Sequence, residues 1–226
     1  MFFFSIFLGY QALFETLSTR GDFSTLLASF ISCLGLQRDI GAIATKGWLA
    51  IERQLMPRID ITCRSIVGVH PRGLTDQAGY AEKGHKCDAL IQLLNTTDSN
   101  LSDSSADACR QAVDYLHIIF DTCCDTPSLR VRTVLSWMVL LTDDFVELLS
   151  CHQPEALVIL AYYDVILHDM KDFWMVGDGG QYLVRSVTEH LGIAWQKWLT
   201  WPNAAISQSC IALPATLKGN SHSANT

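Results

Sequence analysis

The sequence predicts an all-α protein, an irregular helical bundle of roughly eight to ten helices in a single domain. Three observations predict this class. Apolar residues recur at helical spacing along most of the chain, no stretch of useful length alternates apolar and polar residues as a half-buried strand does, and prolines and glycines separate the helical segments. With 226 residues, of which 49% are hydrophobic, the chain can bury one substantial core, so one domain spanning residues 1–226 is expected.

The first part of the chain is expected to contain three helices. Residues 7–17 carry apolar side chains at helical spacing and indicate a first, buried helix that ends before Gly21. Phe23–Leu34 fits a second helix, and Ile40–Met56 fits a third that ends at Pro57, because proline cannot continue a helix without losing a backbone hydrogen bond.

The apolar N-terminus, MFFFSIFLGYQALF, is not expected to cross a membrane. Gln11 and Glu15 interrupt its apolar run, which is well short of the ~20 residues that a membrane span needs. It also lacks the basic start of a signal peptide. Because the chain begins inside an apolar helix, we expect the domain to be truncated at its N-terminus.

The middle of the chain combines irregular and polar segments. Residues 59–84 contain Pro71 and four glycines, which predicts irregular structure. A short helix is expected over Lys86–Leu94. Residues 95–107, NTTDSNLSDSSAD, are polar and acidic with one leucine, a composition typical of a mobile loop.

Helical signals return in the second half of the chain. Ala108–Cys124 repeats apolar residues at helical spacing, and Pro127 begins the next helix. Thr142 fits the N-cap of a short helix that begins with two aspartates. Pro154 then opens a long apolar helix, at a position where its missing N–H costs the helix nothing.

The segment after this long helix is the most informative part of the sequence. Glycines between Gly177 and Gly180 break the helical pattern, and a further helix stops at Gly192. Tryptophans then follow at every third position up to Pro202, after which we expect a C-terminal tail over residues 203–226. These tryptophans are Trp195, Trp198 and Trp201.

Charge and cysteine usage restrict the class of protein. The formal net charge is -7 and the 16 lysines and arginines form no run, so the chain lacks the basic surface that a phosphate backbone requires. We expect no direct nucleic-acid binding. Without a secretory signal, the eight cysteines are expected to be reduced. None of them has the CxxC spacing of a structural zinc site, and we expect no metal and no cofactor.

Three phrases between Phe145 and Pro202 follow one another in a specific order. They read FVELLSCHQPEALVILAYYDVILH, DFWMVGDGGQYLV and HLGIAWQKWLTWP, which gives a short helix, a proline-initiated helix, a tryptophan, a glycine loop and terminal tryptophans. In this order they resemble the C-terminal regulatory region of fungal binuclear zinc-cluster transcription factors, particularly those like the sterol uptake control protein. A weaker likeness extends upstream to about Phe2. The family's six-cysteine DNA-binding cluster is absent from this sequence.

The resemblance implies a regulatory domain that controls transcription and has no catalytic activity. In sterol-responsive members of the family this region is understood to bind a sterol, which implies an apolar, sterol-like ligand here. Its other expected partners are proteins of the transcription machinery or a second copy of the chain. The implied location is the nucleus, with a cytoplasmic location before activation, and the implied targets are genes of sterol or secondary metabolism.

An apolar pocket beside the glycine break is the expected ligand site. Its predicted lining consists of large apolar residues, with the glycine loop as a switch between two helix packings. The lining residues are Tyr162, Tyr163, Ile166, Phe173, Trp174 and Met175, and the switch loop is Gly177, Asp178, Gly179 and Gly180. Core packing between helices is the alternative explanation of the same aromatic residues.

Two alternative functions stay open. Asp143, Asp144 and Glu147 in DDFVE could hold magnesium against a diphosphate, as in helical terpene cyclases, although no second metal-binding motif follows. The same aspartates fit the first turn of a helix capped by Thr142. A purely structural interaction or dimerisation module without a ligand is the other alternative. His168, on an apolar helical face, is expected to be a hydrogen-bonded packing residue.

Overall fold

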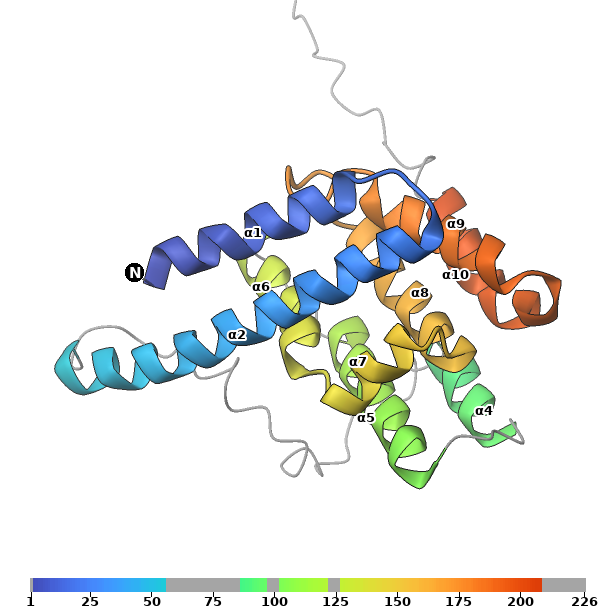
Figure 1. Cartoon of the computed structure of the whole chain (residues 1–226), viewed down its shortest axis with the longest axis horizontal. Coiled ribbons are helices and arrows are strands. Elements are labelled where there is room, and N and C mark those ends of the chain that lie inside the picture. The colour runs from blue at the N-terminus through green and yellow to red at the C-terminus, as the bar shows by residue number, and fades with distance from the viewer. Residues whose placement is uncertain (1, 56–85, 97–101, 122–126, 209–226) are drawn as a thin grey trace, which may run out of the picture.

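The computed structural model describes residues 2–55, 86–96, 102–121 and 127–208. Within these ranges the chain forms nine α-helices, one short 3-10 helix, η3 (Ile193–Trp195), and no strand, so the predicted all-α fold is confirmed (Figure 1). The α-helices are α1 (Phe2–Ser18), α2 (Phe23–Leu55), α4 (Asp88–Thr96), α5 (Asp103–Asp121), α6 (Pro127–Leu140), α7 (Asp143–Ser150), α8 (Pro154–His168), α9 (Gly179–Leu191) and α10 (Gln196–Gln208). The segment predicted to be irregular, residues 59–84, lies outside the described residues.

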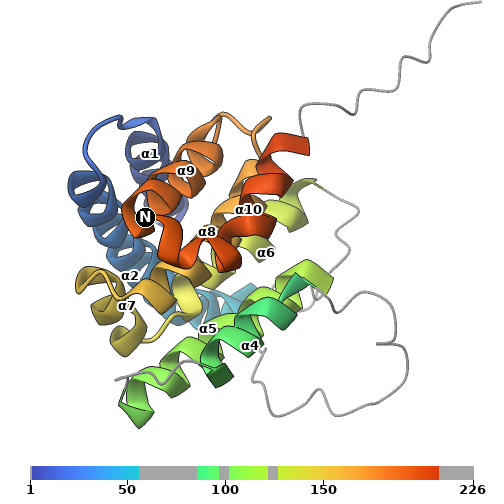
Figure 2. The ribbon, with the colours of Figure 1, turned by 90° about the vertical axis from the view of Figure 1, so that its right-hand side faces the viewer.

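Helix α8 forms the centre of the bundle, with α4, α5, α7, α9 and α10 packed around it (Figure 2). Every residue from Glu155 to His168 is buried, so this helix is enclosed on all sides. Pro154 begins it at a position where no intrahelical N–H bond is lost. A helix that is apolar all round is stable only when neighbours cover it, which explains why α8 is the central element.

Helices α1 and α2 run alongside each other as a hairpin on one side of the bundle (Figure 1). The sequence predicts two helices, Phe23–Leu34 and Ile40–Met56, where the structure has the single unbroken helix α2. One of its interior glycines, Gly41, packs closely against α6. At Gly41, an added Cβ would lie 2.6 Å from Cγ1 of Val139, so tertiary packing outweighs the low helix propensity of glycine here.

Helix α1 is buried on one face only. The sequence predicts a buried helix, and Leu13 and Leu17 are in the core, whereas Phe7 and Leu8 are exposed. The opposite sides of the helix therefore have different environments. Across the ranges that the structure describes, every helix is too short or too polar to cross a membrane.

Helix α5 begins inside the segment that the sequence predicts to be a mobile loop, residues 95–107. Ser102 acts as its N-cap: the hydroxyl accepts a hydrogen bond from the Ser105 N–H at 3.2 Å, and the carbonyl accepts one from the Ala106 N–H at 2.9 Å. Polar and acidic residues are favoured at such a helix start. The loop prediction is therefore wrong for residues 95, 96 and 103–107, while residues 97–101 lie outside the described ranges.

Helix α10 continues through Pro202, where the sequence predicts the end of the helical part. Proline has no N–H, so the carbonyl of Trp198, four residues earlier, loses its helical partner. The hydroxyl of Tyr162 on α8 donates to this carbonyl at 3.4 Å. The predicted tail is wrong for residues 203–208, which are helical, because a neighbouring helix supplies the missing donor.

Candidate functional site

The aromatic residues predicted to line a pocket point in different directions. Tyr162 and Tyr163 follow each other on α8, but the Tyr162 hydroxyl bonds to α10, whereas the Tyr163 hydroxyl donates to the Val134 carbonyl of α6 at 3.2 Å. The Tyr163 ring also stacks on Trp137, with centroids 4.2 Å apart. Both tyrosines and Ile166 are buried in the packed core. In this packing, the three residues do not surround one common space.

The loop between α8 and α9 carries the other three predicted lining residues. Met175 is buried, Phe173 is half-buried, and Trp174 is 53% exposed. The Trp174 ring lies 5.7 Å from the Phe14 ring of α1, so it packs on the outside of the hairpin. A ligand pocket containing all six predicted residues would require a different packing of α8 and this loop.

The switch loop contains glycines of two kinds. Gly177 has φ of 52°, in the left-handed region that glycine enters at little cost. Gly179 instead starts α9, where the helix touches α1: an added Cβ would lie 2.5 Å from Cβ of Leu17. Gly179 therefore determines how closely α9 approaches α1, and its backbone angle is not unusual.

Arg20, in the turn between α1 and α2, connects the switch loop to the α1–α2 hairpin through hydrogen bonds and an ion pair. Its guanidinium donates to the Leu17 carbonyl at 2.6 Å and forms an ion pair with Asp178. The guanidinium carbon also lies 4.4 Å from the centre of the Tyr182 ring, and the Tyr182 hydroxyl donates to the Gly21 carbonyl at 3.0 Å. One cation thus connects the end of α1, the switch loop and the first turn of α9.

Gly180 allows α9 to press directly onto the backbone of α8. A Cβ at this position would lie 2.5 Å from the His168 amide nitrogen and 2.6 Å from the Asp164 carbonyl oxygen. These are backbone atoms, which cannot rotate away as a side chain would. The contact between the two helices therefore depends on the absence of a side chain at Gly180.

Asp164 and His168 occupy the same turn of α8, four residues apart, under this contact. Both side chains are buried, and neither carboxylate oxygen nor ring nitrogen has a hydrogen-bond partner among the described residues. Burial raises the pKa of Asp164 well above its usual range. Burial, followed by the charge of Lys171, lowers the pKa of His168. His168 is thus a packing residue, as predicted, but without the predicted hydrogen bond.

The acidic motif DDFVE lies at the start of α7, and its two aspartates face different neighbours. Thr142 caps the helix by accepting the Phe145 N–H at 3.3 Å, as the sequence predicts. Asp143 pairs with Arg38 of α2 at 2.6 Å, whereas Asp144 accepts a hydrogen bond from Ser104 of α5. The motif is therefore divided between two interfaces and does not present three carboxylates to one cation.

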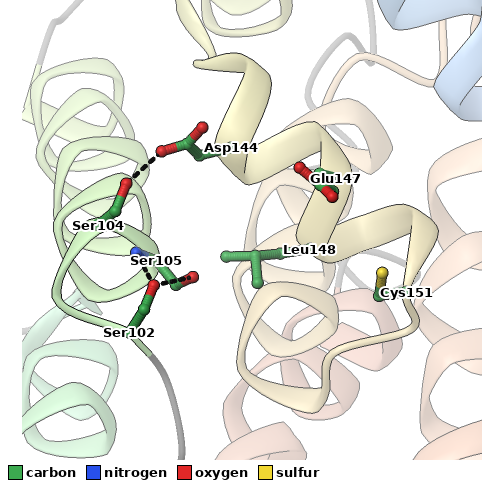
Figure 3. A pocket seen from close by; sticks show the side chains of 7 residues that line it. All are labelled: Ser102, Ser104, Ser105, Asp144, Glu147, Leu148 and Cys151. Carbon is green, nitrogen blue, oxygen red and sulfur yellow. Dashed lines mark hydrogen bonds between the residues drawn. The ribbon is translucent and has the colours of Figure 1, made fainter.

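A hollow of about 300 Å³ lies between α5 and α7, beside the second half of this motif (Figure 3). Glu147 and Asp144 give its α7 side negative charge, and serine hydroxyls form the α5 side. Its lining residues are Ser102, Ser104, Ser105, Asp144, Glu147, Leu148 and Cys151. The described residues contain no group of three or more histidines, cysteines, aspartates or glutamates arranged to hold a metal ion.

Replacing Asp143 and Asp144 together with asparagine should lower the free energy of unfolding by about 1 to 2 kcal/mol at most, because exposed first-turn charges and surface ion pairs contribute fractions of a kcal/mol each. Urea denaturation of the double variant measures this loss. Magnesium-dependent release of diphosphate from a prenyl diphosphate, abolished by the same double change, would instead favour the cyclase alternative.

Sequence reasoning missed Arg20 and Asp164. Asp164 has a signal in the sequence, since it is the one charged side chain between Glu155 and His168 in an otherwise apolar helix. Arg20 has no comparable signal, because its partners come from distant parts of the chain. Within the described ranges no cysteine forms a disulfide, and these cysteines are Cys33, Cys87, Cys109 and Cys151.

Comparisons of the chain with models of protein families, with curated proteins and with solved structures found no match.

Proposed function

We propose that this chain is a non-enzymatic regulatory domain of the kind found on the C-terminal side of fungal zinc-cluster transcription factors, acting in the nucleus through a change in the packing of α9 on α8. The observation that supports it is the buried pair Asp164 and His168, left without partners under the close contact at Gly180. Each buried polar group without a partner lowers the stability of this packing.

The buried pair makes a second packing energetically accessible. An unsatisfied buried polar group costs roughly 1 to 3 kcal/mol, which a rearrangement that hydrates or bonds it would recover. The observed packing is stabilised by the close contacts at Gly179 and Gly180 and by the ion pair between Arg20 and the switch loop. Two packings that differ by a few kcal/mol are what a ligand or a partner chain needs in order to shift a population.

A reporter assay tests this proposal directly. The chain is fused to a heterologous DNA-binding domain, and transcription from a matching promoter is measured. We expect the fusion to change reporter output relative to the DNA-binding domain alone, and Arg20→Gln, which releases Asp178, to change that output further. Arg110→Gln removes another surface ion pair, with Asp107 inside α5, and should leave the output unaltered. A fusion indistinguishable from the DNA-binding domain alone would contradict the proposal.

An apolar ligand of sterol size is expected to raise the melting temperature and to quench tryptophan fluorescence. A ligand that binds only the folded state stabilises it by RT ln(1 + [L]/Kd), about 2.7 kcal/mol at a hundredfold excess over Kd. Because Trp174 lies on the loop whose packing would change, Trp174→Phe should remove most of the quenching and keep the thermal shift.

Failure of a panel of sterols and other apolar metabolites to alter either signal would favour the second candidate, an interaction or dimerisation module. The filled space around Tyr162, Tyr163 and Ile166 supports that candidate. The regulatory domain is expected to respond to a ligand and the interaction module is not. Neither candidate is an enzyme.

A further inference from the structure

His152 occupies an unusual backbone position at the end of α7. Its φ is 54°, the one positive value among non-glycine residues in the described ranges. The Gln153 N–H donates to the Leu148 carbonyl at 2.9 Å and the His152 N–H to the Leu149 carbonyl at 3.0 Å, the two bonds of a Schellman motif. Glycine is the usual residue at this position, so a histidine here carries a conformational cost.

That position brings the His152 ring to His190, in the last turn of α9. The two ring centroids lie 5.4 Å apart, with an angle of 41° between the ring planes. Phe23, at the start of α2, stacks on the His190 ring at 4.1 Å and lies 5.8 Å from the His152 ring. The two imidazoles therefore meet at a junction of three segments that are distant in the sequence, and solvent reaches both rings.

We propose that His152 and His190 form a two-imidazole site for a divalent transition metal such as Zn²⁺. A zinc ion bonded at ~2.1 Å to one nitrogen of each ring lies about 3.2 Å from each ring centroid, and a tetrahedral angle at the metal then separates the centroids by about 5.2 Å. The observed separation is 5.4 Å. This centroid spacing is compatible with one shared ion, and the Phe23 ring stacks on the His190 ring.

The chemistry of the pair decides which ions it takes. Neutral imidazole nitrogens suit zinc, copper and nickel, whereas magnesium and calcium prefer oxygen ligands. Within the described ranges no third histidine, cysteine or carboxylate joins the pair, so water would have to complete the coordination shell of a bound ion. This is an open, exchangeable site, distinct from the closed structural zinc site that the cysteine spacing excludes.

The left-handed backbone of His152 allows a variant in which metal binding and stability are expected to change in opposite directions. His152→Gly removes the ligand nitrogen and at the same time relieves the left-handed backbone, so the variant should be more stable than wild type without metal. His190→Phe keeps an aromatic ring stacked against Phe23 but has no nitrogen that could bind a metal ion. The melting temperature of the full chain is measured against zinc chloride concentration. Wild type should show a saturable rise, and each variant should bind at least about tenfold more weakly, since even loss of an outer-shell partner costs 10–100-fold.

Three controls separate this site from adventitious binding. His117→Gln and Cys151→Ser should retain the wild-type zinc response, since neither residue belongs to the pair, and magnesium chloride should give no saturable rise. A wild-type chain without a zinc-dependent shift would overturn the site. So would an equal shift in wild type, His152→Gly and His190→Phe, because zinc would then be held by other side chains.

Discussion

Replacing Gly180 with alanine should lower the free energy of unfolding by about 3 kcal/mol, at the upper end of the range for overpacked sites. The new methyl group would sit 2.5 Å from the His168 amide nitrogen and 2.6 Å from the Asp164 carbonyl oxygen. Because both are backbone atoms of the central helix, the strain is relieved only if α9 moves away from α8. Urea denaturation measures the loss, and circular dichroism should show that helix content changes much less than stability.

Gly35→Ala is the matched control for this substitution. Gly35 lies in α2, is exposed, and has no atom within 4 Å of the position of an added Cβ. Alanine there should raise the free energy of unfolding by roughly 0.5 to 1 kcal/mol, the usual difference between the two residues inside a helix. Equal effects at Gly35 and Gly180 would mean that helix propensity, and not the α8–α9 contact, explains the result.

A larger side chain at Gly180 also tests the proposed change in packing. Valine at Gly180 should displace α9 further than alanine does, so its effect on reporter output or on ligand response should exceed its effect on helix content. This expectation depends on close approach alone. Gly180 has no positive φ, unlike Gly177, so backbone strain plays no part at that position.

The sequence predicts those parts of the fold whose signals are local. Pro154, the apolar run after it and Thr142 each determine a helix start through their own backbone chemistry, and all three are found where expected. The error at Pro202 occurs because a distant segment overrides the local signal. Pro202 would end a helix in isolation, but the hydroxyl of Tyr162 satisfies the carbonyl that Pro202 leaves without a partner.

The candidate sites were less predictable, for a geometric reason. Neighbouring helical residues point about 100° apart, so which of Tyr162 and Tyr163 faces a given helix depends on the packing around α8. His152 and His190 share no local motif and meet only because α7, α8 and α9 pack together. A sequence pattern can mark large aromatic residues or histidines as candidates, but the packed structure decides which of them meet.

The buried pair under Gly180 should also be visible in the pH dependence of stability. Asp164 has its pKa raised by burial, so the folded state keeps this proton at pH values where the unfolded chain, with an ordinary value of 3.8, has lost it. Stability from this group is therefore fully present below about pH 4 and is lost as pH rises, by up to about 1.4 kcal/mol per pH unit for one proton.

Asp164→Asn should remove this loss, because asparagine has a similar shape and carries no charge at any pH. The variant and wild type should have similar stability near pH 4, and the variant should become progressively the more stable as pH rises to 8. Since His168 is present in both proteins, its opposite contribution, lost as pH falls below 6.5, largely cancels in the difference. Parallel stability curves for Asp164→Asn and wild type would mean that the carboxyl is solvated or paired in solution, and the proposed reason for a second packing would be lost with it.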